Sequence, residues 1–394
     1  MATVRDAFLI GQLYSDLNMS DKRIVALIDM DCFYVQVHLE QEPVYKGRPS
    51  VVVQYQKSRE KNPTTSTATT ARESGGDGII AVSYEARYKG VKRGEHRFLH
   101  QARKLCPELH AFQVAEKHGK ASLTLYRDAS KRVVNIMKRF CAHIERASID
   151  ECYLDLTQRA KEYHLPTDPE ELANCWLSGE ESIKASTAAI IARADDMSRA
   201  TQLVADIRRA IYNELGFTCS AGISINKMAA KFIAGLKKPN AQSVLFPEQV
   251  DEYFKTVPIR KLRGLGGKLG AELCANFGVD LCGHVSNIGD QQLVAAFGQS
   301  EATFIRDMSN GRDEEPVKLR LAAESCGSGR NFLGRDKISQ RSDLNRWVNS
   351  LLSDLYERLD EFKEDDGVVP KKLIVHLAWV RSFVLKYFQI TPIM

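Results

Sequence analysis

The sequence predicts an α+β fold in which a sheet carries helices on one face. Strand-like apolar runs and amphipathic helical stretches follow one another in the order strand, helix, strands, helix and strand. Acidic motifs also lie at the ends of two of the predicted strands. A length of 394 residues, with 44% hydrophobic and 27% charged residues, allows two to four globular domains.

The acidic motifs define the first strand and a later one. The run 23–28 is almost entirely apolar and rich in β-branched residues, which is typical of a strand buried on both faces, and it ends at Asp29. The pair Asp150 and Glu151 comes directly before the strand predicted at 152–156. We therefore expect Asp29, Asp150 and Glu151 to meet on one sheet.

The remaining elements follow from local pattern. Polar and apolar spacing predicts a hairpin of two strands, at 50–55 and 78–84, around a polar insert at 57–78. It also predicts amphipathic helices at 123–140 and 203–215 and a further strand at 218–224. The tract 157–199 is predicted to be polar and irregular. A third helix opens at 224–231. Its stripe Met228, Phe232, Ile233 and Leu236 is expected to pack inward, with Lys227 and Lys231 on another face.

Composition excludes several classes of protein. The net charge of +5 is only a weak indication of a polyanionic partner. Nine cysteines without a Cys-x-x-Cys spacing favour reduced thiols over disulfides or a zinc site. The N-terminal apolar patch is too short for a signal peptide. The apolar run 373–394 is interrupted by His376, Arg381 and Lys386, so we expect a buried strand and no membrane span.

The acids point to phosphoryl or nucleotidyl transfer. Carboxylates that converge on one site repel each other unless cations bridge them, and oxygen-only ligands suit Mg²⁺. Two such ions, about 4 Å apart, can activate an attacking hydroxyl and stabilise a leaving pyrophosphate. Either motif alone is ambiguous, because acids also mark strand ends and helix caps. The two motifs together favour the catalytic interpretation.

Basic and glycine-rich segments supply candidates for phosphate contacts. Tyr84, Arg87 and Arg93 follow a predicted strand, although a solvated basic surface remains an alternative. The segment 258–270 joins basic residues to glycines that let a backbone approach a DNA phosphate. We call its central residues the glycine-rich turn: Gly264, Gly266, Gly267 and Lys268. A tight helix–helix turn with incidental charge is the alternative.

Five segments together resemble the signatures of the Y-family translesion DNA polymerases: 29–37, 80–87, 144–151, 219–224 and 235–240. The resemblance implies a right-hand polymerase with a ferredoxin-like palm, small fingers, a helical thumb and an incomplete little-finger domain. It implies the following boundaries: a disordered lead-in at 1–22, the palm at 23–32 and 120–240, the fingers at 33–119, the thumb at 241–314 and the little finger at 315–394.

The resemblance also implies roles for single residues. Asp29, Asp150 and Glu151 would ligate two Mg²⁺ ions, with Mn²⁺ as an alternative, and the Met30 carbonyl would be a further ligand. Tyr34 would be the steric gate that excludes a ribose 2′-OH. Tyr84, Arg87 and Lys238 would hold the triphosphate, Arg93 would lie over the incoming nucleotide, and Gln54 would touch the template base. Asp31 has no ligand role and is expected to cap the next helix.

The expected function is template-directed DNA synthesis past damaged bases such as linked pyrimidines, with primer-template DNA and deoxynucleoside triphosphates as partners and a nuclear location. The resemblance fades after Val380, so the little finger looks truncated. The sliding-clamp and ubiquitin contacts of the family have no counterpart motif here. Two alternatives stay open: a non-catalytic DNA-binding or regulatory variant, and a nucleotidyl cyclase, which would not need the glycine-rich turn.

Overall fold

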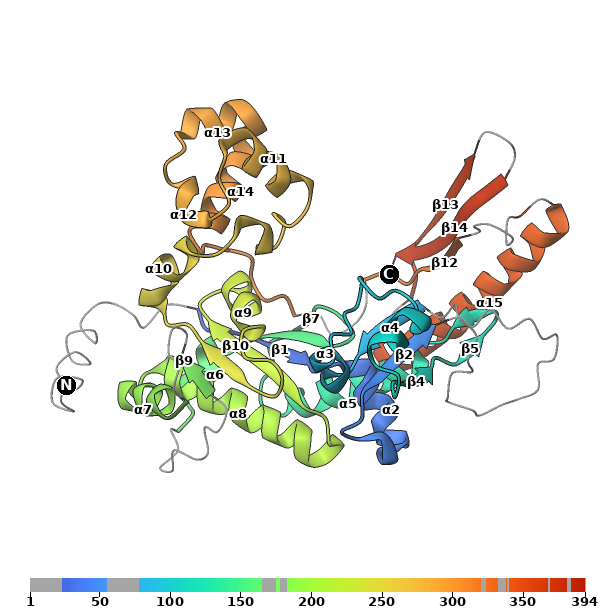
Figure 1. The fold of residues 1–394 in the computed structure, drawn as a ribbon, viewed down its shortest axis with the longest axis horizontal. Helices are drawn as coiled ribbons and strands as arrows, with labels where there is room; N and C mark the ends of the chain where they lie inside the picture. The colour runs from blue at the N-terminus through green and yellow to red at the C-terminus, as the bar shows by residue number, and fades with distance from the viewer. Residues whose placement is uncertain are drawn as a thin grey trace. The chain divides into compact units, whose positions relative to one another are not determined.

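The computed structural model describes most of the chain as two compact units (Figure 1). The first unit contains Met1–Phe33 and Ala129–Leu319, and the second contains Tyr34–Asp128 and Arg320–Met394. The described residues are 23–54, 78–164, 175–177, 183–319, 324–331, 338, 340–367, 369–380 and 384–393. The α+β class is confirmed, and the subdomain boundaries stay predictions. The lead-in, and the polar insert up to residue 77, lie outside the described residues.

A six-stranded sheet forms the centre of the first unit. Its order is β7 (Ile144–Arg146), β8 (Glu151–Asp155), β1 (Val25–Met30), β10 (Cys219–Ser224), β11 (Gln242–Val244) and β9 (Cys175–Leu177). The predicted strands at the acids are thus confirmed. β1 is antiparallel to both β8 and β10 and is almost wholly buried, as its apolar sequence requires.

Helices cover both faces of this sheet, so the prediction of helices on one face is wrong. α9 (Lys227–Ala234) lies on one side of the sheet and α8 (Asp196–Leu215) on the other (Figure 1). Every residue of β10 is buried, which explains why the strand needs a cover on each face. α9 packs closely on Gly222, where a Cβ atom would lie 2.1 Å from the Ala230 carbonyl oxygen.

The Gly222→Ala substitution is expected to lower the free energy of unfolding by about 1–3 kcal/mol, because α9 must move away from β10 to admit the methyl group. Urea unfolding followed by circular dichroism measures the change. Gly235→Ala is the matched control, because the nearest atom to its Cβ would be 3.6 Å away. Equal midpoints for the two variants would contradict the close packing of α9 on the sheet.

The tract 157–199 is ordered where the structure describes it, which contradicts the prediction of an irregular segment. It contains α6 (Thr157–Lys161), β9, α7 (Ile183–Arg193) and the start of α8. Asp195 caps α8, since its side chain accepts a hydrogen bond from the Ser198 N–H. Ser198 in this tract is buried and its hydroxyl also donates to Asp195 Oδ1, so polar residues here do not signal exposure.

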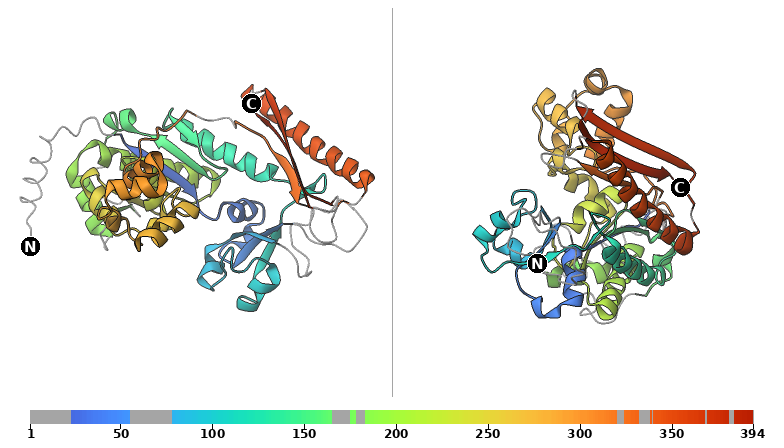
Figure 2. Two further views of the ribbon diagram at one scale, coloured as in Figure 1. Left: turned by 90° about the horizontal axis from the view of Figure 1, so that it is seen from above. Right: turned by 90° about the vertical axis from the view of Figure 1, so that its right-hand side faces the viewer.

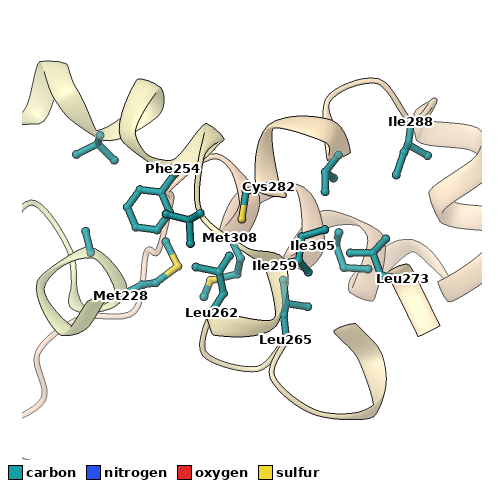
Figure 3. Close-up of a cluster of buried hydrophobic side chains, with 14 of the residues drawn as sticks. Met228, Phe254, Ile259, Leu262, Leu265, Leu273, Cys282, Ile288, Ile305 and Met308 are labelled. Atoms are coloured by element: carbon teal, nitrogen blue, oxygen red, sulfur yellow. The ribbon is translucent and has the colours of Figure 1, made fainter. Parts of the chain in front are cut away.

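The rest of the first unit is a small helical cluster. It contains η3 (Pro247–Gln249), α10 (Val250–Lys255), η4 (Ile259–Lys261), α11 (Lys268–Phe277), α12 (Cys282–Val285), α13 (Asp290–Phe297) and α14 (Gln299–Ser309). Apolar side chains from these helices, including Phe254, Leu265, Leu273 and Ile305, form a continuous core that reaches Met228 on α9 (Figure 3). This core fixes the glycine-rich turn between η4 and α11.

The second unit contains two three-stranded sheets. In the first, β2 (Ser50–Gln54) pairs with β3 (Gly78–Val82), as predicted, and with β4 (His110–Gln113). In the second, the order is β12 (Ser328–Asn331), β14 (Val384–Ile393) and β13 (Lys372–Val380), and α15 (Arg341–Asp366) lies along it (Figure 2). The other elements of this part are α2 (Phe33–Gln41), η1 (Pro43–Tyr45), α3 (Tyr84–Tyr88), α4 (Leu99–Leu105), β5 (Glu116–Lys117), β6 (Lys120–Ala121) and the start of α5 (Thr124–Lys138).

The C-terminal apolar run forms strands, as expected, but it is not uniformly buried. Leu373 is 60% exposed and Val375 is 47% exposed, so the prediction of a buried strand is wrong for these residues of β13. None of the helices in the described ranges is long and apolar enough to cross a membrane.

Candidate active site

The three predicted acids lie together on the central sheet. Asp29 is the direct partner of Glu151 in the antiparallel pairing of β1 with β8. The backbone N–H of Met30 donates a hydrogen bond of 2.9 Å to the Asp150 carbonyl oxygen, which extends the pairing to the turn before β8. Residues separated by 120 positions or more are thus neighbours, as the sequence predicted.

Two lysines neutralise these carboxylates. Lys238 Nζ lies 2.6 Å from Asp29 Oδ2, and Lys231 Nζ lies 2.8 Å and 3.0 Å from the two carboxylate oxygens of Glu151. Among the described residues, no three His, Cys, Asp or Glu side chains are close enough to hold a metal ion together. Lys231 and Lys238 supply positive charge beside Glu151 and Asp29. The sequence analysis placed Lys231 only on a face of its helix away from the apolar stripe, and its pairing with Glu151 was not predicted.

Burial makes the Asp29 carboxylate costly to ionise. Burial raises the pKa of Asp29 to about 6, the Lys238 ammonium opposes that rise, and the neighbouring charges of Glu151 and Asp150 add to it. A buried carboxylate among other acids is costly to ionise without a positive partner. The Lys238 ammonium is that partner for Asp29.

Ser148 orients the turn that carries Asp150. Its hydroxyl donates a hydrogen bond of 2.5 Å to Asp150 Oδ1. Ser148 Oγ also accepts hydrogen bonds from the backbone N–H groups of Asp150 and Glu151. Sequence reasoning missed this role, although a serine two residues before an aspartate is a recognisable turn signal. The serine holds the turn so that both acids keep a defined direction.

Asp31 holds the loop that carries Lys238. Its carboxylate is 1% exposed and accepts hydrogen bonds of 2.8 Å from the Ser220 hydroxyl and from the backbone N–H of Asn240. Asn240 lies two residues after Lys238, so Asp31 ties this loop to β1 and β10. This positioning role was not predicted. The proposed cap on α2 stays a prediction.

The predicted nucleotide-contact residues lie in the second unit, apart from Lys238. Ser83 caps α3 by accepting from the Ala86 N–H, which places Tyr84 and Arg87 on the first turns of a short helix. The Arg87 guanidinium lies over the Tyr84 ring at 4.5 Å from its centroid, and its Nε donates to the Val82 carbonyl. Arg93 is exposed in the turn after α3, and Gln54 ends β2. Their contacts with a nucleotide or template stay predictions.

The glycine-rich turn opens α11. Gly264 has a φ of +83°, which favours glycine, and Gly267 lies directly before the helix with no atom within 4 Å of a would-be Cβ. The Lys268 side chain is 90% exposed. An open helix N-terminus with an adjacent cation suits a backbone phosphate.

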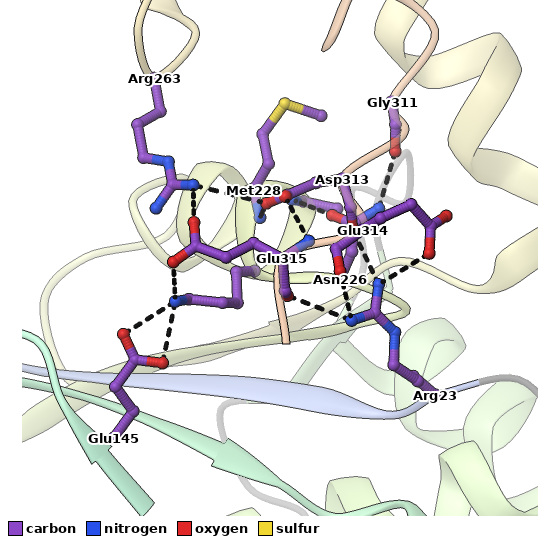
Figure 4. A network of polar contacts seen from close by, with 11 residues as sticks. Arg23, Glu145, Asn226, Met228, Arg263, Gly311, Asp313, Glu314 and Glu315 are labelled. Carbon is purple, nitrogen blue, oxygen red and sulfur yellow. Dashed lines mark hydrogen bonds and ion pairs between the residues drawn. The ribbon is translucent and has the colours of Figure 1, made fainter. Parts of the chain in front are cut away.

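Lys227 is buried in a charged network, which contradicts its predicted place on a polar face. Its ammonium lies 2.8 Å and 2.9 Å from the Glu145 carboxylate oxygens and 2.8 Å from Glu315 (Figure 4). Arg263 also pairs with Glu315, and hydrogen bonds from both cations lower the pKa of Glu315 to about 2. Leu236, predicted to pack inward, is 43% exposed because α9 ends at Ala234.

Known proteins match the chain over this site and beyond it. Residues 28–235 match the impB/mucB/samB family, and residues 257–312 match the helix-hairpin-helix motif described as DNApol eta/Rev1, HhH motif. DNA polymerase eta of Arabidopsis thaliana is 36% identical over 92% of this chain and 54% of its own length. DNA polymerase eta of Drosophila melanogaster is 34% identical over 92% of this chain and 43% of its own length.

A shorter relative is matched over more of its length. DNA polymerase IV of Vibrio vulnificus is 31% identical over 79% of this chain and 70% of its own length. The chain spans about half the length of the eta polymerases that it matches. The family match includes the three acids, all of β8 and the end of β1 from Ile28. The chain therefore belongs to the impB/mucB/samB family, the Y-family DNA polymerases.

Proposed function

We propose that this chain is a template-directed DNA polymerase that transfers deoxynucleotides to a primer 3′-OH. The observation that carries the proposal is the pairing of Asp29 with Glu151 beside Asp150, within a sequence that belongs to the Y-family. The names of the matched relatives, DNA polymerases eta and IV, support the same reaction class. Translesion synthesis opposite linked pyrimidines and a nuclear location are proposed from the family resemblance alone.

The donor set suits divalent cations such as Mg²⁺ or Mn²⁺. Asp29, Asp150, Glu151 and the Met30 carbonyl would hold them, because hard cations prefer such oxygen ligands and the pairing of β1 with β8 brings these acids together. Bound there, two ions would supply charge stabilisation for the attacking and leaving oxygens. Ser148 would keep Asp150 in one orientation.

The lysines of the site would serve the phosphates. Lys238 lies on a loop that Asp31 fixes, so its ammonium is held at Asp29, which engages one of its three N–H donors and leaves two for phosphate oxygens. We propose that it contacts the triphosphate there. Lys231 would balance the charge of Glu151 from α9 and limit the repulsion between the acids.

A primer-extension assay with Mg²⁺ tests the proposed reaction. The unaltered chain should extend a primer according to the template base, and Asp150→Ala should not. DNA binding without synthesis, even at low salt, would favour a non-catalytic DNA-binding variant. Formation of a cyclic nucleotide without a template would favour a nucleotidyl cyclase.

Tyr34→Ala is expected to admit ribonucleotides. The ring of Tyr34 is proposed to occupy the space that a 2′-OH needs, so its removal takes away the steric penalty. The ratio of kcat/KM for a deoxynucleotide to kcat/KM for the matching ribonucleotide should fall by on the order of 10²-fold. An unchanged ratio would refute the gate role.

One observation supports DNA binding, with or without synthesis: the helix-hairpin-helix match at 257–312 includes the exposed Lys268. Lys268→Ala is expected to weaken DNA binding at all sequences and to reduce the salt slope of log K by about 1. Fluorescence anisotropy at several salt concentrations measures both. An unchanged slope would exclude Lys268 from the phosphate contacts.

A further inference from the structure

The ring of Tyr34 rests on a second tyrosine. Tyr34 on α2 stacks on Tyr126 of α5, with ring centroids 4.1 Å apart and an angle of 27° between the planes. Tyr126 is 1% exposed, whereas Tyr34 is half-buried. One face of the Tyr34 ring is therefore covered by a side chain that has no room of its own to move.

Tyr126 is held in turn by a buried histidine. Its hydroxyl forms a hydrogen bond of 2.8 Å with His38 Nε2, and His38 is 2% exposed. The His38 ring stacks on Phe112 of β4, with centroids 4.8 Å apart and 7° between the planes. Nδ1 of His38 is buried without a hydrogen-bond partner in the described part of the chain. The Tyr126 hydroxyl and the Phe112 ring therefore fix the imidazole.

These contacts form a row of rings that runs from the β4 strand to Tyr34. Burial lowers the pKa of His38 to about 4 and raises the pKa of Tyr126. Both groups are therefore neutral at neutral pH, and their hydrogen bond persists there. His38 and Tyr34 lie four residues apart on α2, so one turn of this helix carries both residues that contact Tyr126.

We propose that Tyr126 and His38 are positioning residues that fix the Tyr34 ring and so determine how strictly a nucleotide 2′-OH is excluded. The inference rests on the proposed function, because it needs Tyr34 to face the sugar. A steric gate works only while its ring stays in place, since a rotation of the ring would open the space that the hydroxyl needs. The stack on Tyr126 removes that freedom on one side.

The test measures the kcat/KM ratio of deoxynucleotide to ribonucleotide in the full chain. Tyr126→Leu, which removes the supporting ring, is expected to lower the ratio by about 3- to 10-fold. Tyr126→Phe keeps the ring and should lower the ratio less. His38→Phe, which keeps a ring against Phe112, should match Tyr126→Phe, because each removes the same hydrogen bond. A ratio is independent of the fraction of folded enzyme, so a loss of stability does not mimic the effect.

The control and a double variant separate the possible failures. Tyr163→Phe loses a comparable tyrosine hydrogen bond, to Asp206 at 3.1 Å, and should keep the native ratio. Adding Tyr126→Leu to Tyr34→Ala should cause no further loss, because the gate is already absent. A native ratio in Tyr126→Leu, or the same loss in both backgrounds, would overturn the positioning role. A native ratio in Tyr34→Ala would instead refute the gate itself, and this inference with it.

Discussion

Asp29→Asn is expected to lower the rate of template-directed incorporation by on the order of 10²–10³-fold, with primer-template affinity nearly unchanged. The substitution keeps the size of the side chain and removes its charge at the point where β1 and β8 place the acids side by side. It also leaves Lys238 without its carboxylate partner. Single-turnover incorporation measures the rate, and fluorescence anisotropy measures the binding of DNA.

Asp155→Asn provides the matched control for that experiment. Asp155 lies at the other end of β8, where it pairs with Val25 of β1 and accepts hydrogen bonds from Thr157. Asp155→Asn is the same chemical change as Asp29→Asn and falls on the same pair of strands, but Asp155 lies outside the group of three acids. Its incorporation rate should stay within a few-fold of the native rate. If the two variants lost activity equally, the loss would reflect damage to the sheet and not removal of a catalytic acid.

Lys227→Ala is expected to lower the free energy of unfolding by about 3–5 kcal/mol, the largest stability effect that we predict. The substitution leaves the buried Glu145 carboxylate without a positive partner, and it takes one of the two cations from Glu315. Both acids lie far from Lys227 along the chain, so the network joins α9, β7 and the segment after α14 (Figure 4). Denaturant unfolding of the full chain measures the effect.

Two comparisons make the Lys227 prediction specific. Lys255→Ala removes an exposed ion pair to Glu252 and should change stability by no more than about 0.5 kcal/mol. Lys227→Met combined with Glu145→Gln should recover part of the loss, because no unpaired charge remains on Glu145. If Lys227→Ala had the same denaturant midpoint of unfolding as the unaltered chain, the stabilising role of this network would be contradicted.

The same network predicts how acid affects stability. The pKa of Glu315 is lower in the folded chain than its ordinary value, so ionised Glu315 stabilises the fold at pH values above about 4.5. That contribution is lost as the pH falls toward 2, where the folded-state carboxyl takes up its proton.

Local pattern was enough to predict the elements that place the acids. β1 is an unbroken apolar run because both of its faces are buried, and such a run can be read without knowledge of its neighbours. The direct pairing of Asp29 with Glu151 followed from two strands that carry acids at their ends. The helix at α5 was predicted equally well, since its apolar residues recur with helical spacing.

The residues that the sequence did not reveal act through distant partners. Lys227 looks like a surface lysine until Glu145 and Glu315 are brought to it by the fold. Lys231 and Asp31 likewise acquire their roles from Glu151 and from the Asn240 backbone. The tract 157–199 was wrongly predicted as irregular because buried polar groups with internal hydrogen bonds, such as Ser198, have the same composition as a loop.

Direct measurement of cation binding tests whether the acids of β1 and β8 form one catalytic centre. Mn²⁺ would be titrated into the full chain with primer-template and a non-hydrolysable deoxynucleotide, and followed by electron paramagnetic resonance. The account predicts that Asp29→Asn and Asp150→Asn each weaken Mn²⁺ binding by at least about tenfold, while Asp155→Asn binds like the native chain. Native Mn²⁺ affinity in both site variants would contradict it.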